Sequence, residues 1–141
     1  SSAASDVYKR QQQKAESKNI YFQVELPEHV ICEHDKNWMC EAFYNFFDNA
    51  VKYSENGSRI DITMKQTEMF YKIMVRDYGI GIKKGEENLI FQRFYRGEQA
   101  RGQEGCGIGL YLSREIVLLQ KGMMKAKQMK PGLLIEVNLP V

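Results

Sequence analysis

The segment from Glu41 to Tyr53 places amide and ammonium side chains at helical spacing. In a helix, Asn45, Asn49 and Lys52 share one face with Glu41, because residues three and four apart stack above one another. The apolar residues fall mostly on the remaining surface: Phe43, Phe46, Phe47, Ala50 and Val51. An amide oxygen can ligate Mg²⁺, and a nearby lysine suits the phosphates that share the metal. The stripe fits a metal-phosphate surface, although two asparagines one turn apart also occur as ordinary exposed residues.

Two glycine motifs could surround a nucleotide. In Asp77-x-Gly79-x-Gly81, the carboxylate could accept a hydrogen bond from the exocyclic amine of adenine, and the glycines would let backbone pass close to a flat ring. Gly105-x-Gly107-x-Gly109 precedes a helix-like segment, whose N–H groups and positive dipole end could cradle phosphate. Each motif alone also fits an ordinary turn, and the second lacks the context of a Rossmann site or a P-loop.

Length and composition narrow the class of protein. With 141 residues and a net charge of +2, the chain is one ordinary domain without the basic excess of a nucleic-acid binder. No apolar run reaches membrane-spanning length and no signal peptide is present, so we expect a soluble chain. Cys32, Cys40 and Cys106 lack zinc-site spacing and indicate free thiols in a reducing compartment. The chain does not begin with Met, and we expect it to be a piece of a longer protein.

Hydrophobic periodicity predicts the order of elements. Residues 1–19 read as a linker or the end of an upstream helix, 20–26 and 30–32 as strands, and a helix starts near Trp38 behind Asp35 as cap. Asn56-Gly57 ends this helix. The strands 59–64 and 70–77 form an antiparallel hairpin, a short helical run covers 86–94, and a helix covers 107–120. Two final strands, 123–129 and 133–139, are joined by a Pro-Gly turn.

This order predicts an α+β fold. Strands in adjacent pairs with helices between the pairs favour a mostly antiparallel sheet covered by helices on one face, a two-layer sandwich. Asp77 would then end a central strand, and the long glycine-bounded segment between Gly81 and Gly105 would be a functional loop. We expect Trp38 in the core.

Four motifs in this order resemble the N, G1, F and G2 boxes of the catalytic ATP-binding domain of bacterial sensor histidine kinases. They are Asn45-x-x-x-Asn49-x-x-Lys52-Tyr53, Asp77-x-Gly79-x-Gly81, Phe91-x-x-Phe94-Tyr95-Arg96 and Gly105-x-Gly107-x-Gly109-Leu110. The resemblance covers the chain from about Ile20 to its end, so we assign residues 20–141 to this domain. It departs from the family at Lys83, where Pro is common, and at Gln120-Lys121-Gly122, which replaces His-Gly-Gly.

The resemblance implies a Bergerat-type sandwich that binds Mg·ATP. It places Asn49 on the metal with Asn45 in support, Lys52 near phosphate, Tyr53 beside the nucleotide and Asp77 on the adenine. It likewise implies that Arg96 approaches phosphate and that Phe91 and Phe94 anchor the lid between Gly81 and Gly105. Asn45, Lys52 and Arg96 would be the catalytic residues. The resemblance also assigns these further positions to the nucleotide site: Gly79, Gly81, Ile82, Phe91, Phe94, Gly105, Gly107, Ile108, Gly109 and Leu110.

The N box also indicates what kind of reaction to expect. Gyrases, mismatch-repair ATPases and large heat-shock chaperones carry a Glu general base one turn before the metal-binding Asn, whereas this chain has Asn45, whose amide cannot take a proton. Glu41 lies a further turn away, and only a shifted register would make it a substitute. We expect feeble hydrolysis and transfer of the γ-phosphate to an outside nucleophile. His29 and His34 lack the family's acceptor context, so the acceptor histidine would lie upstream.

The resemblance implies partners as well. The full-length protein would be a homodimer in the cell membrane with this domain in the cytoplasm, acting with its own upstream dimerisation and phosphoacceptor domain and a response regulator. The isolated chain would be a monomer. Two alternatives stay open: a hydrolytic ATPase of the same superfamily, and an anti-sigma-like serine kinase or interaction module.

Overall fold

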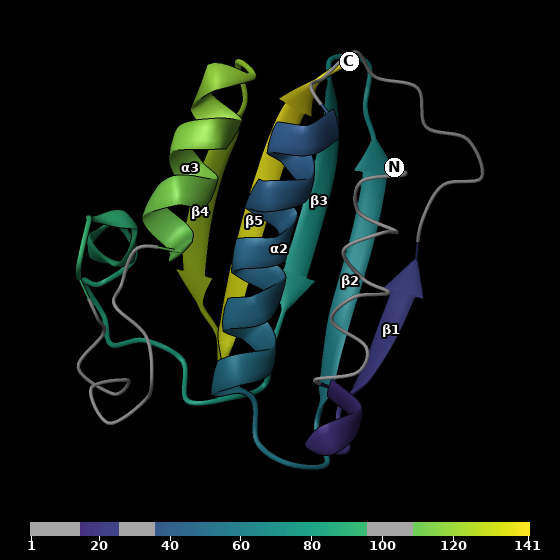
Figure 1. Ribbon diagram of the computed structural model, residues 1–141, viewed down its shortest axis with the longest axis vertical. Coiled ribbons are helices and arrows are strands. Elements are labelled where there is room, and N and C mark those ends of the chain that lie inside the picture. Colours follow the sequence, from purple (N-terminus) through teal and green to yellow (C-terminus); the bar gives the residue numbers. More distant parts are fainter. Residues whose placement is uncertain (1–14, 26–35, 96–108) are drawn as a thin grey trace.

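The computed structural model describes residues 15–25, 36–95 and 109–141, which form one sheet with helices on one face (Figure 1). A helical turn at 15–17 leads into the first strand. The elements that follow are β1 (Tyr21–Glu25), α2 (Lys36–Tyr53), β2 (Arg59–Gln66), β3 (Phe70–Arg76), the 3₁₀ turn η1 (Leu89–Phe91), α3 (Gly109–Leu119), β4 (Met123–Gln128) and β5 (Leu133–Pro140). No helix within these ranges has the length and apolar character needed to cross a bilayer.

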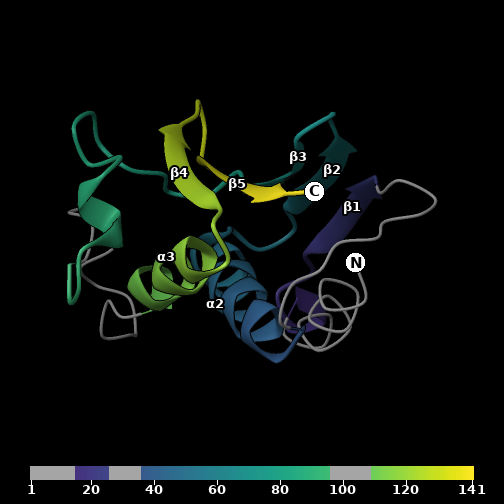
Figure 2. The ribbon, with the colours of Figure 1, turned by 90° about the horizontal axis from the view of Figure 1, so that it is seen from above.

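The sheet has five strands in the order β1-β2-β3-β5-β4. β1 pairs with β2 in parallel, and the other three pairings are antiparallel. Seen from above, α2 and α3 lie side by side under one face of the sheet, and no helix of the described residues lies over the other face (Figure 2). The predicted two-layer, mostly antiparallel α+β fold is therefore confirmed, with β3 at the centre. The expected strand at 30–32 and the cap Asp35 lie outside the described residues.

Alternating strands and the apolar side of α2 make the core. Ile62, Val75 and Ile135 face one another across β2, β3 and β5 in the register of the sheet, and all three are buried. α2 turns its apolar positions, spaced three and four apart, onto this row: Phe43, Phe46, Phe47, Ala50 and Val51. The two helices touch closely where the Ser113 hydroxyl of α3 donates to the Ala42 carbonyl at 2.9 Å. This packing fixes the position of α2, which carries the polar stripe.

Two sequence-based expectations about the core and the loop were wrong. Trp38 is 56% exposed and lies in the first turn of α2, one turn before the buried Ala42. The helical run expected at 86–94 is reduced to η1. The segment does not continue as a helix because it folds around Glu86. The Glu86 carboxylate accepts hydrogen bonds from the Lys83 N–H at 2.8 Å and the Tyr95 hydroxyl at 2.6 Å. These bonds close the segment into a loop around a buried carboxylate.

The change from His-Gly-Gly to Gln120-Lys121-Gly122 has a backbone consequence. α3 ends in a Schellman motif, in which Gly122 N–H donates to the Val117 carbonyl at 2.9 Å and Lys121 N–H donates to the Leu118 carbonyl at 3.0 Å. Lys121 occupies the left-handed position with φ of +63°. Most helices use glycine there, because a Cβ strains this conformation.

We expect Lys121→Gly to raise the free energy of unfolding by about 0.5–1 kcal/mol. Relief of a left-handed conformation gains roughly 1–2 kcal/mol, and the extra entropy of glycine in the unfolded chain takes back about 0.5–1 kcal/mol. Urea denaturation monitored by circular dichroism measures the change. Lys127→Gly, on exposed strand β4, is the control and should lower stability. A Lys121→Gly protein less stable than the wild type would contradict the assignment.

Candidate functional site

The polar stripe of α2 faces the start of α3. A Cβ built on Gly109 would lie 3.8 Å from the Asn45 Cβ and 4.0 Å from its Oδ1, so the two motifs meet at this point. Asn49 and Lys52 follow on the same helix, one and two turns on, and both are partly buried. The Lys52 ammonium lies 5.8 Å from the centroid of the Tyr53 ring. Amide, ammonium and phenol groups thus line one edge of α2 beside the beginning of α3.

The side chain of Asn45 contains a buried hydrogen-bond donor. Its Nδ2 atom is buried and has no hydrogen-bond partner among the residues that the structure describes. A buried donor without a partner costs about 1–3 kcal/mol, so such groups are uncommon in folded proteins. An acceptor that enters the site, such as a phosphate oxygen, would satisfy it.

Asp77 is a buried carboxylate with one committed oxygen. It directly follows β3 and is 4% exposed. Its Oδ1 accepts hydrogen bonds from the N–H groups of Gly79 at 3.0 Å and Leu133 at 3.3 Å, and neither bond reaches Oδ2. Burial raises the pKa of Asp77 to about 6, while the two backbone bonds and the charge of Arg76 partly offset this effect. At neutral pH the group is an under-solvated carboxylate, which an N–H donor of a ligand would stabilise.

The turn after Asp77 is pressed against the end of α2. A Cβ on Gly79 would lie 1.9 Å from the Tyr53 carbonyl oxygen, and the Ile80 N–H donates to that oxygen at 3.4 Å. Gly79 is therefore required by helix packing, a reason that the sequence did not reveal. Through Tyr53 and Asn45, α2 touches both glycine motifs and joins the three into one site.

Sequence reasoning missed the contribution of β5. Gly132 was expected only to turn a hairpin, yet a Cβ there would lie 2.0 Å from the Asp77 carbonyl oxygen, and the neighbouring Leu133 donates to the Asp77 side chain. The sequence signal that could have revealed Gly132 and Leu133 is the Pro-Gly turn before the last strand. This turn points to Asp77 only once β5 is known to pair with β3.

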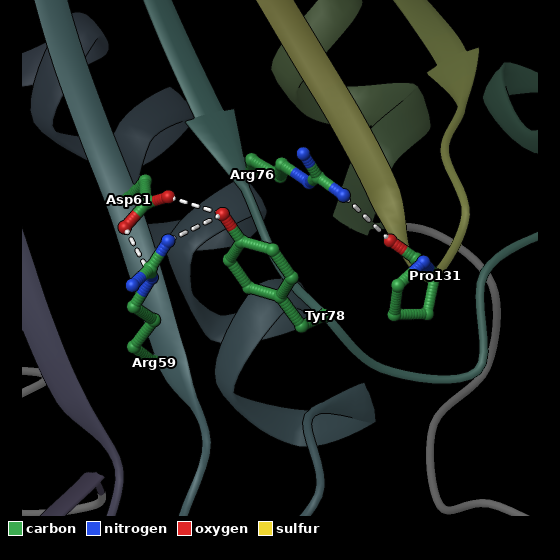
Figure 3. A network of polar contacts seen from close by, with 5 residues as sticks. All are labelled: Arg59, Asp61, Arg76, Tyr78 and Pro131. Carbon is green, nitrogen blue, oxygen red and sulfur yellow. Dashed lines mark hydrogen bonds and ion pairs between the residues drawn. The ribbon is translucent and has the colours of Figure 1, made fainter.

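The uncovered face of the sheet holds this turn from behind (Figure 3). The Tyr78 ring lies between two guanidinium groups, with Arg76 at 4.2 Å and Arg59 at 5.0 Å from its centroid. The Tyr78 hydroxyl donates to Asp61. Arg76 also donates to the Pro131 carbonyl oxygen at 3.2 Å, which ties the β4–β5 turn to β3. Tyr78 on one face and Asp77 on the other are thus fixed together.

The two phenylalanines of the F box differ. Phe91 in η1 is 4% exposed and packs in the core, as expected of an anchor. Phe94 is 60% exposed, with φ of +67° and the Arg93 guanidinium 5.0 Å from its ring. The expectation that Phe94 anchors the loop was wrong, because its backbone conformation turns the ring to solvent.

The remaining expected site positions are distributed along this loop and α3. Ile82 is buried and Leu110 partly buried, and Gly81 has φ of +68°. Arg96, Gly105, Gly107 and Ile108 lie outside the described residues. Two observations within the described residues fit an Mg-nucleotide: the Asn45 Nδ2 in the middle of α2 has no partner there, and both backbone bonds to Asp77 go to Oδ1 and leave Oδ2.

Comparison with known proteins identifies the family. The profile of the histidine kinase-, DNA gyrase B- and HSP90-like ATPases matches residues 34–141. The chain belongs to this family. The fold and the four motifs place it with the catalytic ATP-binding domains of sensor histidine kinases, as the sequence predicted.

Two curated relatives of this ATPase domain are sensor kinases. The signal transduction histidine-protein kinase/phosphatase MprB of Mycobacterium leprae is 36% identical over 99 residues, which are 70% of this chain and 19% of that protein. The sensor protein CiaH of Streptococcus pneumoniae is 35% identical over 130 residues, 90% of this chain and 29% of the relative. The chain thus spans less than a third of either relative.

Solved histidine kinase structures share the fold. A mycobacterial sensor histidine kinase MprB aligns with a TM-score of 0.84 at 27% identity, over 99% of this chain and 92% of that one. The catalytic domain of histidine kinase ThkA aligns with a TM-score of 0.87 at 22% identity over the same shares. The second likeness supports the fold alone.

Asp77 should make the stability of this ATPase domain depend on pH. Because its pKa is raised in the folded state, the folded chain holds this proton more tightly than the unfolded chain, and its contribution to stability is lost as pH rises from about 4 to about 6. Asp77→Asn keeps an acceptor for the two N–H groups and removes the buried charge. We expect it to be more stable than the wild type at pH 7.5, by up to about 3 kcal/mol for a shift of about two units.

Urea denaturation of both proteins from pH 4 to pH 8 measures this effect, and the advantage of Asp77→Asn should shrink toward pH 4. Glu136→Gln is the control of opposite sign. Burial alone would raise the pKa of Glu136, but hydrogen bonds from Asn138 and Lys125 and the charges of Lys125 and Lys72 outweigh it and lower the pKa. Equal pH profiles for wild type and Asp77→Asn would rule out a buried titrating carboxyl at this site.

Proposed function

We propose that the chain binds Mg·ATP and donates the γ-phosphate to a histidine on a separate, upstream dimerisation domain of a two-component sensor kinase. The observation that carries this proposal is the position of α2. The helix meets Gly109 at Asn45, and its last residue, Tyr53, meets the turn after Asp77 through its main-chain oxygen. The proposed phosphate-binding residues thus belong to α2, and the carboxylate proposed to bind adenine lies beside the turn that the end of α2 contacts.

Asp77 would select adenine. Its Oδ2 receives no hydrogen bond from Gly79 or Leu133, the two donors that fix Oδ1. The exocyclic amine of adenine is a donor that suits this oxygen, whereas a 6-oxo base presents an acceptor in the same place. A charge-assisted bond in a buried setting is worth about 1.5–3 kcal/mol.

The α2 stripe would hold the phosphates. The buried Nδ2 of Asn45 is a donor in need of an acceptor, and Lys52 supplies a positive charge two turns on. Asn49 would contribute its amide oxygen to a magnesium ion, which when bound neutralises phosphate charge and bridges to the nucleotide. Arg96 is proposed as a second cation for the γ-phosphate.

Transfer, and not hydrolysis, suits these residues. α2 runs unbroken from Lys36 to Tyr53, which places Glu41 two turns before Asn49, and Glu41 is exposed. Asn45 at the base position cannot accept a proton from water. The chain would position the γ-phosphate and leave proton transfer to an imidazole acceptor.

Within the whole protein, we propose that this domain acts in the cytoplasm. The named relatives are a histidine kinase/phosphatase and a sensor protein, each more than three times the length of the matched part. The proposed partners are the upstream dimerisation and phosphoacceptor domain of the same protein and a response regulator. The proposed full-length form is a homodimer held in the cell membrane.

Nucleotide binding tests the adenine site. We expect the chain to bind ADP in the presence of Mg²⁺, and to bind inosine diphosphate, which has an oxo group in place of the amine, about ten- to a hundredfold more weakly. Asp77→Asn should weaken ADP binding by a similar factor, since it removes the charge that assists the bond. Isothermal titration calorimetry at pH 7.5 measures all of these affinities.

The matched control for this titration is Glu136→Gln, which removes a carboxylate from the neighbouring strand β5. Its hydrogen bonds run to Asn138 and Lys125, away from Asp77, so ADP affinity should be unchanged. As pH falls below about 6, wild-type ADP affinity should also weaken, because Asp77 takes up a proton. Equal affinity for ADP and inosine diphosphate would remove Asp77 from adenine recognition.

Phosphotransfer tests the reaction class. With γ-labelled ATP and the dimerisation domain of the same protein added in trans, we expect label on that domain in an acid-labile, alkali-stable form, as for a phosphoramidate. Asn49→Ala should lower the rate about a hundredfold or more, because phosphate charge is no longer neutralised in place. Glu41→Gln on the exposed side of α2 is the control. Acid-stable label would instead indicate a seryl acceptor, and ATP turnover lost in Glu41→Gln would indicate a hydrolase.

A further inference from the structure

Residues 15–20, directly before β1, pack against the domain. The helical turn at 15–17 ends in a Schellman motif, with Ile20 N–H donating to the Ala15 carbonyl at 2.9 Å and Asn19 N–H donating to the Glu16 carbonyl at 3.0 Å. Asn19 takes the left-handed position with φ of +55°, which asparagine tolerates better than most residues. Ala15 and Ile20 are both buried in the core. The residue between these anchors, Lys18, is therefore held in place.

Lys18 reaches from this turn to the end of α2. Its ammonium donates to three carbonyl oxygens, those of Val51 at 3.0 Å, Lys52 at 3.1 Å and Ser54 at 2.9 Å. These three bonds use every proton of the ammonium group. They also place a positive charge at the negative end of the helix dipole.

Of the last carbonyl groups of α2, only that of Tyr53 bonds to the turn after Asp77 among the described residues. At the end of a helix the last carbonyls have no partner within the helix. The Ser54 hydroxyl takes the Ala50 oxygen at 2.6 Å, and Lys18 takes those of Val51, Lys52 and Ser54. The Tyr53 oxygen points to the turn after Asp77 and accepts from Ile80 at 3.4 Å.

We propose that Lys18 is a positioning residue for adenine recognition. By fixing the carbonyls on both sides of Tyr53, its ammonium sets where the Tyr53 oxygen meets Gly79 and Ile80, and thereby where the Asp77 carboxylate is held. In this role Lys18 does not touch the nucleotide, and residues 15–20 act on the adenine pocket through it. This role rests on the proposed function as an ATP-binding domain.

Three variants separate positioning from general stability. Lys18→Met removes the charge and all three bonds, Lys18→Arg restores a cation with several donors, and Lys127→Met on exposed β4 is the matched control. We expect Lys18→Met to weaken ADP binding about three- to tenfold at a temperature where every variant is folded. Its preference for ADP over inosine diphosphate should fall, because the Asp77 contact is the one disturbed. Lys18→Arg should recover most of both effects, and Lys127→Met should change neither.

A second readout does not require nucleotide. In ¹H–¹⁵N spectra of the nucleotide-free chain, the Gly79 and Ile80 amide signals should move in Lys18→Met and return toward wild type in Lys18→Arg, while signals of β4 stay in place. If Lys18→Met fails to fold, Lys18→Gln, which keeps an amide donor, is compared in the same way.

The outcomes distinguish the two proposals. Lowered thermal stability in Lys18→Met with unchanged ADP affinity, unchanged base preference and unmoved Gly79 and Ile80 signals would overturn the positioning role and leave the ATP-binding function intact. Absence of ADP binding by the wild type would overturn the proposed function, and with it adenine positioning. The amide signals would then still report whether Lys18 sets the turn.

Discussion

The contact between the last carbonyl groups of α2 and the turn after β3 is the constraint on which the site depends. At Gly79 there is no space for even a methyl group, because a Cβ would lie 1.9 Å from the Tyr53 oxygen. α2 therefore has one position along the sheet, set by backbone atoms. The same helix carries Asn45 and Asn49, so the distance between the carboxylate at the sheet and the amides near α3 follows from this single contact.

The site buries two polar side chains, Asp77 and Asn45, although burial of such groups is unfavourable for folding. Asp77 is almost fully buried, and burial shifts its pKa upward despite two backbone donors. The Asn45 Nδ2 is buried without a partner in the described part of the chain. Asn45 lies in the middle of α2, and Asp77 lies directly after β3, next to the turn that meets the end of α2. Buried polar groups with incomplete hydrogen bonding are typical of binding sites, where a ligand supplies the missing partners.

The sequence was informative where structure follows local pattern. Period-2 alternation located β2, β3 and β5, and apolar spacing of three and four located α2, because each element buries one face against the same core. What sequence reasoning missed depends on contacts between distant residues. Leu133 meets Asp77 across 56 positions, and Lys18 meets Val51 across 33. Phe94 and Trp38 were misplaced for a related reason, since an apolar side chain is buried only where its backbone directs it inward.

The junction between α2 and the turn after Asp77 is made of main-chain atoms of Tyr53, Gly79 and Ile80, and the Lys18 side chain holds the carbonyls on both sides of Tyr53. Side chains at Val51, Lys52, Ser54 and Ile80 can therefore diverge between related proteins without breaking the bonds that join these segments, provided that the backbone keeps its course. Related proteins can therefore keep the backbone geometry of this junction while their side chains change. Proteins that share it could differ widely in their side-chain chemistry and still hold a carboxylate and an amide stripe in the same relation.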